Sequence, residues 1–327
     1  MINRIKIFAP ARIHVNLFDM SGRGYRQNGG LGFCITGFDT VIEFKVSKDF
    51  AVVDNRSVGL TKAEEKSLLG HLEEVYKKNG FSEKISIEFI SGPPPHSGFG
   101  TGTSTKLACV EAASIFNNIE ANQAQLVSDS GRGGTSGVGI NTYFQGGLSI
   151  DFGVKASGLP LAPSSARNSP LEKPLQLLNI KLPADWDFGV IIPSASKGIS
   201  ANEEVDFFNK TCPIPLSAVH ESIYHAISGV ACAALECDFL TFSKSINEIQ
   251  KTDWKKAEWL IQSDLIYKLR SELQDLGVEC VGLSSLGPAL YFMANDFKSI
   301  INKIQPSDEY IVMRCSPNNF GREIKID

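Results

Sequence analysis

Residues 92–103 read GPPPHSGFGTGT, a proline run that leads into a turn rich in glycine and threonine. Apolar residues alternate with polar ones over 85–89 and predict a strand before this turn. Residues 103–117 are mostly apolar and predict a helix after it. The N–H groups of residues 100–104 then lie at a helix N-terminus, where free donors and the helix dipole both favour phosphate. The stretch therefore predicts a phosphate-binding loop.

Two better-known nucleotide motifs do not fit this loop. The phosphate loop GxxxxGKS or GxxxxGKT needs a lysine that is followed by serine or threonine, and the chain has neither at that spacing. The dinucleotide fingerprint needs three glycines, and Thr103 occupies the place of the third after Gly98 and Gly100. A plain tight turn is the structural alternative. The order of strand, glycine loop and apolar helix favours phosphate binding over it.

Two further stretches are dense in glycine: residues 131–139, GRGGTSGVG, and residues 26–32, RQNGGLG. Glycine lets the backbone approach a ligand closely, and successive free N–H groups attract anions. Arg132 lies between glycines and can therefore reach a phosphate with two hydrogen bonds, the alternative being a surface arginine in a flexible loop. Together the three stretches predict a protein that binds a small phosphorylated molecule.

The composition excludes several other classes of protein. The chain has 327 residues and a net charge of −4, so it lacks the basic field of a general nucleic-acid or membrane-surface binder. The seven cysteines form no CxxC pair and the five histidines form no zinc signature. Neither a signal peptide nor a membrane-spanning run is recognised. We therefore expect reduced thiols and a cytoplasmic protein.

The remaining pattern predicts an α+β protein of two domains, residues 1–170 and 171–327. The rest of the first domain is predicted to contain strands at 2–8, 41–46 and 147–151 and a helix at 61–79. Residues 153–175 are rich in Pro, Ser, Gly and Ala and predict a long connection. The second domain is predicted to contain helices at 217–235 and 255–275 and strands at 188–192, 280–283, 289–293 and 309–314.

With that loop in place, the chain resembles one branch of the galactokinase, homoserine kinase and mevalonate kinase (GHMP) superfamily. The branch comprises beta-ribofuranosylaminobenzene 5'-phosphate synthase and its relatives that make C-glycosides. Residues 131–137 are the most specific match, because this arginine–glycine block distinguishes the synthases from the kinases. The other matching segments are 11–14 with Leu17 and Asp19, 28–32, 96–103, 203–205 with 212–215, and 284–288. The resemblance implies an N-terminal half like ribosomal protein S5 domain 2 and a ferredoxin-like C-terminal half.

The resemblance also implies a reaction and its substrates. An aromatic carboxylic acid, either 4-aminobenzoate or a heteroaromatic analogue, reacts with 5-phosphoribosyl 1-diphosphate. Carbon dioxide and diphosphate leave, and a carbon–carbon bond forms at C1 of the ribose. We expect Mg²⁺ to be required, no organic cofactor, and a homodimer as the usual state of such an enzyme.

This reaction needs groups that stabilise the departing diphosphate, shield the cationic sugar from water and hold the ring against C1. The predicted contacts of the phosphosugar diphosphate are Gly98, Gly100, Thr101, Gly102, Thr103, Ser104, Arg132, Gly133, Gly134, Thr135 and Ser136. Those of the aromatic acid are Asn28, Gly29, Gly30, Ser284 and Ser285. Thr103 and Ser104 are predicted to place a hydroxyl near the metal ion.

Three residues near the first strand are candidate catalytic groups. Arg12 would hold the carboxylate of the acceptor until it leaves as CO2, and Asp19 or His14 would accept a proton or polarise the ring substituent. An Arg12–Asp19 ion pair and a core histidine are the structural alternatives. Glu203 and Glu204 either bind metal or belong to a solvated helix N-terminus.

Two other functions remain open on the sequence. An ATP-dependent kinase of a small alcohol would keep the fold, but it needs adenine contacts and a catalytic Asp or Lys beside the glycine loops. The arginine–glycine block lacks the acidic residue that kinases of this superfamily often carry there. A ligand-binding protein without catalysis is the third class.

Overall fold

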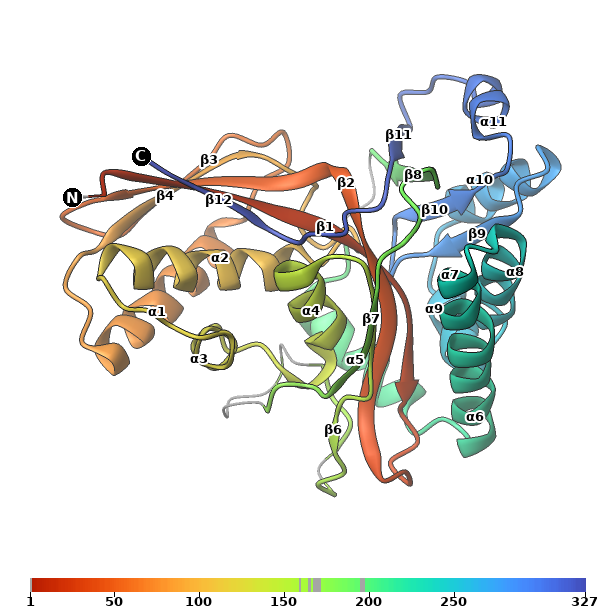
Figure 1. The fold of residues 1–327 in the computed structure, drawn as a ribbon, viewed down its shortest axis with the longest axis horizontal. Coiled ribbons are helices and arrows are strands. Elements are labelled where there is room, and N and C mark those ends of the chain that lie inside the picture. Colours follow the sequence, from red (N-terminus) through yellow and green to blue (C-terminus); the bar gives the residue numbers. More distant parts are fainter. Residues whose placement is uncertain (1, 159, 164–165, 167–171, 195–197) are drawn as a thin grey trace.

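Two β-sheets and their covering helices build the molecule, as the computed structural model shows (Figure 1). The structure describes residues 2–158, 160–163, 166, 172–194 and 198–327. The first sheet has eight strands, in the order β12-β1-β2-β4-β3, with β5 and β6 paired to β2 and β7 paired to β5. The second has four, in the order β11-β8-β10-β9. The expected α+β class is confirmed.

The strands are β1 (Arg4–Asp19), β2 (Arg26–Val46), β3 (Ala51–Asp54), β4 (Ile85–Ser91), β5 (Leu148–Asp151), β6 (Val154–Lys155), β7 (Gln176–Ile180), β8 (Phe188–Pro193), β9 (Cys280–Leu283), β10 (Leu290–Met293), β11 (Tyr310–Cys315) and β12 (Glu323–Ile326). The helices are α1 (Lys62–Asn79), α2 (Thr101–Phe116), α3 (Gln123–Asp129), α4 (Gly137–Gln145), α5 (Ala201–Thr211), α6 (Leu216–Tyr224), α7 (Cys232–Glu236), α8 (Phe239–Ile249), α9 (Asp253–Leu260), α10 (Asp264–Asp275) and α11 (Phe297–Lys303), with a 3-10 turn η1 (Gly134–Ser136) and a π-helical segment η3 (His225–Ala231).

A long antiparallel hairpin of β1 and β2 is the spine of the first sheet. Its pairing runs from Arg4 opposite Lys45 to Asp19 opposite Asn28, so both strands extend far beyond the predicted 2–8 and 41–46. The register shifts between Ala9 and Ala11, where Pro10 has no N–H to donate to the ladder, and again between His14 and Asn16. β12 adds itself antiparallel to the other side of β1, which places the late segment 323–326 beside the start of the chain.

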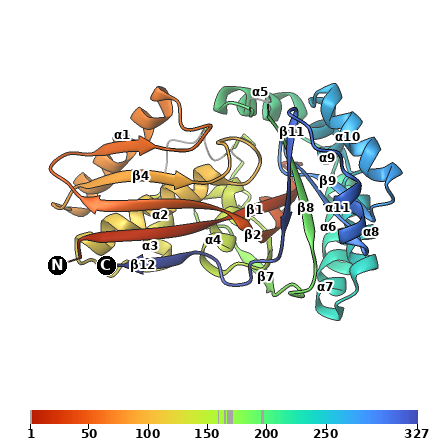
Figure 2. The same ribbon diagram turned by 90° about the horizontal axis from the view of Figure 1, so that it is seen from above.

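Helices pack against both sheets, and β1 contacts α6 as well as α2 and α4. α2 and α4 pack against β1 and β2, whereas α8 and α10 pack against β9. Seen from above, α1 to α4 lie with the first sheet, and α6 to α11 lie with the second (Figure 2). The single predicted helix at 255–275 is two helices, α9 and α10, because Ser263 adopts an extended N-cap conformation between them. The other helices and strands predicted for residues 171–327 are confirmed.

The two sheets meet in a shared aromatic core. The ring of Phe33 on β2 lies 4.7 Å from that of Phe188 on β8 and 6.0 Å from that of Tyr291 on β10, measured between centroids. These residues are buried, so the sheets are joined by apolar contact. The proposed boundary at residue 170 lies outside the described residues and stays a prediction. In the described part of the chain, no helix is long and apolar enough to cross a membrane.

The glycine loop at 96–103 lies between the two sheets and is bonded to both. The carbonyl oxygen of Gly98 accepts hydrogen bonds from Arg12 Nη1 at 2.6 Å and from Ser284 Oγ at 2.7 Å. The backbone N–H of Arg12 also donates to the carbonyl of Phe99 at 3.1 Å. Arg12 belongs to β1 and Ser284 follows β9, so the loop is clamped from both sides.

Gly100 ends this loop at the N-cap of α2, where only glycine is well tolerated. Its φ is 75°, in the left-handed region that side chains rarely adopt. A Cβ atom there would lie 2.9 Å from Nε of Arg12. The glycine therefore lets the arginine side chain reach across the loop.

We predict that Gly100→Ala destabilises the protein by about 1–2 kcal/mol, because alanine is strained in the left-handed conformation and meets Arg12. Gly70→Ala is the matched control, since Gly70 lies within α1 and a Cβ there has no neighbour within 4 Å. That control is expected to gain about 0.5–1 kcal/mol from helix propensity. Urea denaturation of both variants measures the two changes, and equal effects would contradict the strain at Gly100.

Candidate functional site

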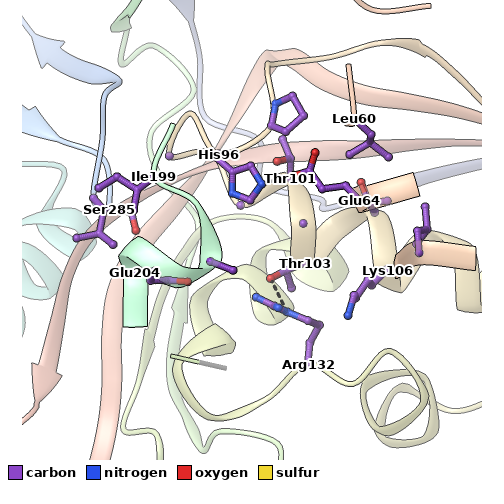
Figure 3. Close-up of a pocket in the computed structure, with 18 of the residues that line it drawn as sticks. Leu60, Glu64, His96, Thr101, Thr103, Lys106, Arg132, Ile199, Glu204 and Ser285 are labelled. Atoms are coloured by element: carbon purple, nitrogen blue, oxygen red, sulfur yellow. Dashed lines mark hydrogen bonds and ion pairs between the residues drawn. The ribbon is translucent and has the colours of Figure 1, made fainter. Parts of the chain in front are cut away.

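Two neighbouring cavities lie beside the glycine loop, and Figure 3 shows residues that line the larger of them. The larger, here called the outer cavity, has a volume of about 290 Å³ and lies between the loop, α1 and the start of α5. The smaller, called the inner cavity, has a volume of about 70 Å³ and reaches toward α9. Both are lined by Arg12, Thr103, Arg132, Glu204, Ser285 and Leu286, which form their common wall.

The start of α2 presents open backbone donors to the outer cavity. The amides of Thr103 and Ser104 donate to the Gly100 carbonyl, at 3.0 and 3.2 Å. Those of Thr101 and Gly102 have no acceptor among the described residues, and both residues line the cavity. Amides at a helix N-terminus attract anions. Of the amides of α2 that were expected to bind phosphate, those of residues 101 and 102 are therefore free to do so.

Two arginines converge on the common wall. Nε of Arg132 donates to Oγ1 of Thr103 at 3.1 Å, whereas Nε of Arg12 is buried without a hydrogen-bond partner in the described part of the chain. Burial and the nearby charge of Arg132 lower the pKa of Arg12 to about 10. Burial also lowers the pKa of Arg132, and the carboxylate of Glu204 opposes both shifts. Two desolvated cations at one wall favour an anionic ligand.

Lys106 adds a third cation on the next turn of α2 (Figure 3). Burial, and then the charge of Arg132, lowers its pKa. Its ammonium makes no hydrogen bond or ion pair with a described residue. Arg56 also lines the outer cavity, but its Nη2 lies 2.6 Å from Oδ2 of Asp54, and His96 pairs with Glu64. Among the described residues on this side, Lys106 is therefore the cation that is open to a ligand.

The inner cavity has aromatic walls and two buried titratable groups. Phe208 and Trp254 are walls, and His14 and Glu258 contribute polar atoms. Nδ1 of His14 is buried without a partner in the described residues, and burial holds the pKa of this imidazole well below its usual value. Its ring is therefore neutral at physiological pH. Burial raises the pKa of Glu258, which Lys255 opposes.

Curated proteins similar to this chain share one name. The Methanocaldococcus jannaschii protein is 32% identical over 336 residues, covering 97% of this chain and 99% of the relative. The Methanothermobacter thermautotrophicus protein is 30% identical over 302 residues, covering 90% of each. Both are named beta-ribofuranosylphenol 5'-phosphate synthase. This chain belongs to that synthase family. It is an enzyme that makes a C-glycoside, although no protein-family model matches it.

Solved structures with the same fold include kinases and a decarboxylase. Staphylococcus aureus mevalonate diphosphate decarboxylase has a TM-score of 0.68 at 14% identity, covering 99% of this chain and 98% of that one. Cytophaga hutchinsonii homoserine kinase has a TM-score of 0.65 at 16% identity, covering 99% and 98%. At this identity the likeness shows the fold alone. It confirms the GHMP kinase-like architecture expected of the synthase and gives the kinase alternative no further support.

Most of the predicted site residues of this synthase do lie at the cavities. Eight of the predicted diphosphate contacts are lining residues: Gly98, Gly100, Thr101, Gly102, Thr103, Arg132, Thr135 and Ser136. Gly133 and Gly134 lie between the lining residues Arg132 and Thr135 in the chain. Ser104 differs from Thr103, because its hydroxyl donates to the Thr101 carbonyl at 3.1 Å and stays within the helix. In the described residues, no group of three His, Cys, Asp or Glu gathers at one point.

The predicted catalytic and acceptor residues are divided between two places. Arg12, His14 and Ser285 line the inner cavity. Asp19 and Asn28 pair at the far end of the β1–β2 hairpin, where Asp19 accepts hydrogen bonds from Ser21.

The remaining acceptor candidates pack against other parts of the chain. Gly29 packs against Phe152, and a Cβ on Gly30 would lie 3.2 Å from Nε2 of His14. Ser284 holds the loop and does not line either cavity. The roles assigned to Asp19, Asn28, Gly29, Gly30 and Ser284 stay predictions.

Several residues at the cavities escaped the sequence analysis of this synthase. These are Lys106, Phe208, Trp254 and Glu258. A signal did exist at 254–259, where a lysine and a glutamate stand three residues apart among apolar residues. Glu203 and Glu204 were left open, and they have separate places. Glu203 forms a capping box with Ser200, whereas Glu204 lines both cavities.

We predict that Arg132→Ala weakens the binding of 5-phosphoribosyl 1-diphosphate by about 10- to 100-fold, the usual loss for a charge-assisted contact. Folding should be unchanged, because within the described part of the chain the guanidinium donates one hydrogen bond, to the hydroxyl of Thr103. Arg314→Ala, which removes an exposed ion pair with Asp187, is the control. Calorimetric titration measures the affinity, and a wild-type value in Arg132→Ala would remove this arginine from the site.

Proposed function

We propose that this enzyme joins C1 of 5-phosphoribosyl 1-diphosphate to the ring of an aromatic carboxylic acid. The observation that carries the proposal is the common wall, where Arg12 and Arg132 lie beside the open amides of Thr101 and Gly102. This combination of fixed cations and helix N-terminal donors suits a diphosphate leaving group. The inner cavity lies directly behind that wall and has Phe208 and Trp254 among its lining residues, which suit an aromatic ring.

The arrangement suggests how the two substrates lie. With the diphosphate at the common wall, C1 of the pentose faces the inner cavity and the 5-phosphate extends into the outer cavity toward Lys106. The acceptor ring enters the inner cavity against Phe208 and Trp254, and its carboxylate reaches Arg12. The apolar walls keep water away from the cationic sugar.

The bond changes balance without an oxidant or a reductant. The C1–oxygen bond breaks, and its electron pair leaves with diphosphate. The ring carbon that carries the carboxylate supplies the pair for the new bond to C1. The bond to the carboxylate then breaks, CO2 departs, and its pair restores the aromatic ring. Arg12 holds the carboxylate in place until that step.

We also propose that Mg²⁺ accompanies the diphosphate. Its oxygen ligands would come from the phosphates, the hydroxyl of Thr103 and the carboxylate of Glu204, which are oxygen donors of the kind that Mg²⁺ prefers. The ion would neutralise charge on the leaving group. Thr103 meets this requirement better than Ser104, whose hydroxyl donates within the helix.

The acceptor is proposed to be 4-hydroxybenzoate, since the relatives are named for a ribofuranosylphenol product. 4-Aminobenzoate differs from it only in the group opposite the carboxylate. All seven cysteines are free thiols, which fits the proposed cytoplasmic location. A homodimer is proposed as the commonest state of soluble enzymes.

The function is tested by incubating the protein with 5-phosphoribosyl 1-diphosphate, Mg²⁺ and either acid. Release of CO2 and diphosphate in equal amounts is the expected result. Formation of ADP from ATP in a parallel incubation with small alcohols would instead establish a kinase. If neither occurs, the protein binds its ligands without catalysis.

The substrate orientation predicts that Lys106→Met raises KM for 5-phosphoribosyl 1-diphosphate by about 10-fold while kcat changes little, because a contact to the 5-phosphate acts in binding. In this variant, inhibition by ribose 5-phosphate should weaken and inhibition by pyrophosphate should persist. Lys66→Met on the exposed face of α1 is the control. Steady-state inhibition kinetics give the answer, and a variant that loses both inhibitors alike would reverse the orientation.

A further inference from the structure

A lysine and a glutamate of α9 are buried beneath the inner cavity. The exposed fractions of Lys255 and Glu258 are 0% and 1%, although both residue types normally face solvent. Removing two charges from water costs free energy that their mutual attraction rarely repays in full. The pair therefore needs a reason beyond stability, and its position at the cavity suggests one.

The carboxylate of Glu258 is held by two neighbours from its own helix. Nε1 of Trp254 donates to its Oε1 at 2.7 Å, and Nζ of Lys255 donates to its Oε2. Lys255 is fixed in turn by the carbonyl of Leu283, at 2.7 Å from Nζ. Each carboxylate oxygen can accept two hydrogen bonds, so each oxygen of Glu258 can still accept one more. Glu258 lines the inner cavity, whereas Lys255 does not. A ligand in that cavity can therefore donate a further hydrogen bond to Glu258.

The lining of the inner cavity also carries groups of opposite charge. Arg12 at the common wall has a buried Nε without a partner in the described part of the chain. Glu258 is the carboxylate on the α9 side, and Nδ1 of His14 is a further buried atom without a partner among the described residues. A ligand that fits this cavity has an anionic end for Arg12, an aromatic body for Trp254 and a hydrogen-bond donor for Glu258.

We propose that Glu258 accepts a hydrogen bond from the hydroxyl or amino group opposite the carboxylate of the acceptor, and thereby selects aromatic acids with such a donor. The inference rests on the proposed function and adds the residue that recognises the acceptor. The carboxylate of Glu258 disfavours a ring without a hydrogen-bond donor, because this buried charge would then have no hydrogen bond from the ligand. Lys255 is a positioning residue, since it acts through Glu258, whereas Trp254 both orients Glu258 and contacts the ring.

The same contact assists the reaction. A hydroxyl that donates to a carboxylate gains electron density at oxygen, and the ring passes this density to the carbon opposite. That carbon bears the departing carboxylate and attacks C1, so the contact strengthens the nucleophile. The proton stays in the hydrogen bond between oxygen and Glu258 during the attack and returns fully to the phenol after CO2 has left.

The test compares the binding of three acids that differ opposite the carboxylate: 4-hydroxybenzoate, 4-methoxybenzoate and benzoate. The wild-type protein should bind 4-hydroxybenzoate at least about 10-fold more tightly than the other two. In Glu258→Gln, its affinity for 4-hydroxybenzoate should fall by about 10- to 100-fold, while the affinity for benzoate changes less than about twofold. Glu248→Gln is the control, because Glu248 forms an exposed pair with Lys251 at the same spacing of three residues.

The outcomes separate this proposal from the proposed function. Loss of affinity for all three acids alike in Glu258→Gln would show a structural role only and overturn the inference. If that variant does not fold, equal binding of 4-hydroxybenzoate and 4-methoxybenzoate to the wild-type protein overturns it. Preferential binding without turnover of 5-phosphoribosyl 1-diphosphate would retain the recognition by Glu258 and refute the synthase reaction.

Discussion

The carbonyl oxygen of Gly98 is the point on which the arrangement of the site depends. It accepts one hydrogen bond from Arg12 of the first sheet and one from Ser284 of the second. The loop cannot move relative to either sheet without breaking one of them. The same clamp directs the start of α2 toward the cavity and keeps Arg12 beside it. A single acceptor atom thus couples the shared core, the open amides and the cationic wall, and preorganisation of this kind is what electrostatic catalysis requires.

The cationic wall exists at the expense of stability. Burial lowers the pKa of Arg12, Lys106 and Arg132. The charged form of each side chain is therefore less favourable in the folded protein than in water. Glu204 offsets this for the two arginines. An incoming diphosphate supplies the remaining counter-charge, so part of its affinity comes from relief of this repulsion. The site is therefore organised for its ligand before the ligand arrives.

The features that could be predicted from the sequence are mostly those formed by residues that are neighbours in the chain. The strand at 85–89, the turn with Gly98 and Gly100, and the helix after it are neighbours in sequence, and they form one unit in the fold. Arg132 was foreseen for a similar reason, because glycines surround it. Asp19 was assigned to the same site as Arg12 from its nearness in sequence, but an extended strand carries it to the far end of the hairpin. Glu258 was missed, because only the tertiary fold brings α9 to the inner cavity.

The pairing of β12 with β1 sets the order in which the protein can assemble on the ribosome. Residues 5–8 bond to residues 323–326, so the edge of the first sheet stays unpaired while almost all of the chain is being made. Exposed strand edges invite association between nascent chains. Contacts so distant in sequence also slow folding. The amino-terminal half therefore completes its sheet only after the synthesis of the carboxy-terminal half, and expression of the first 170 residues alone would leave a strand edge without its natural cover.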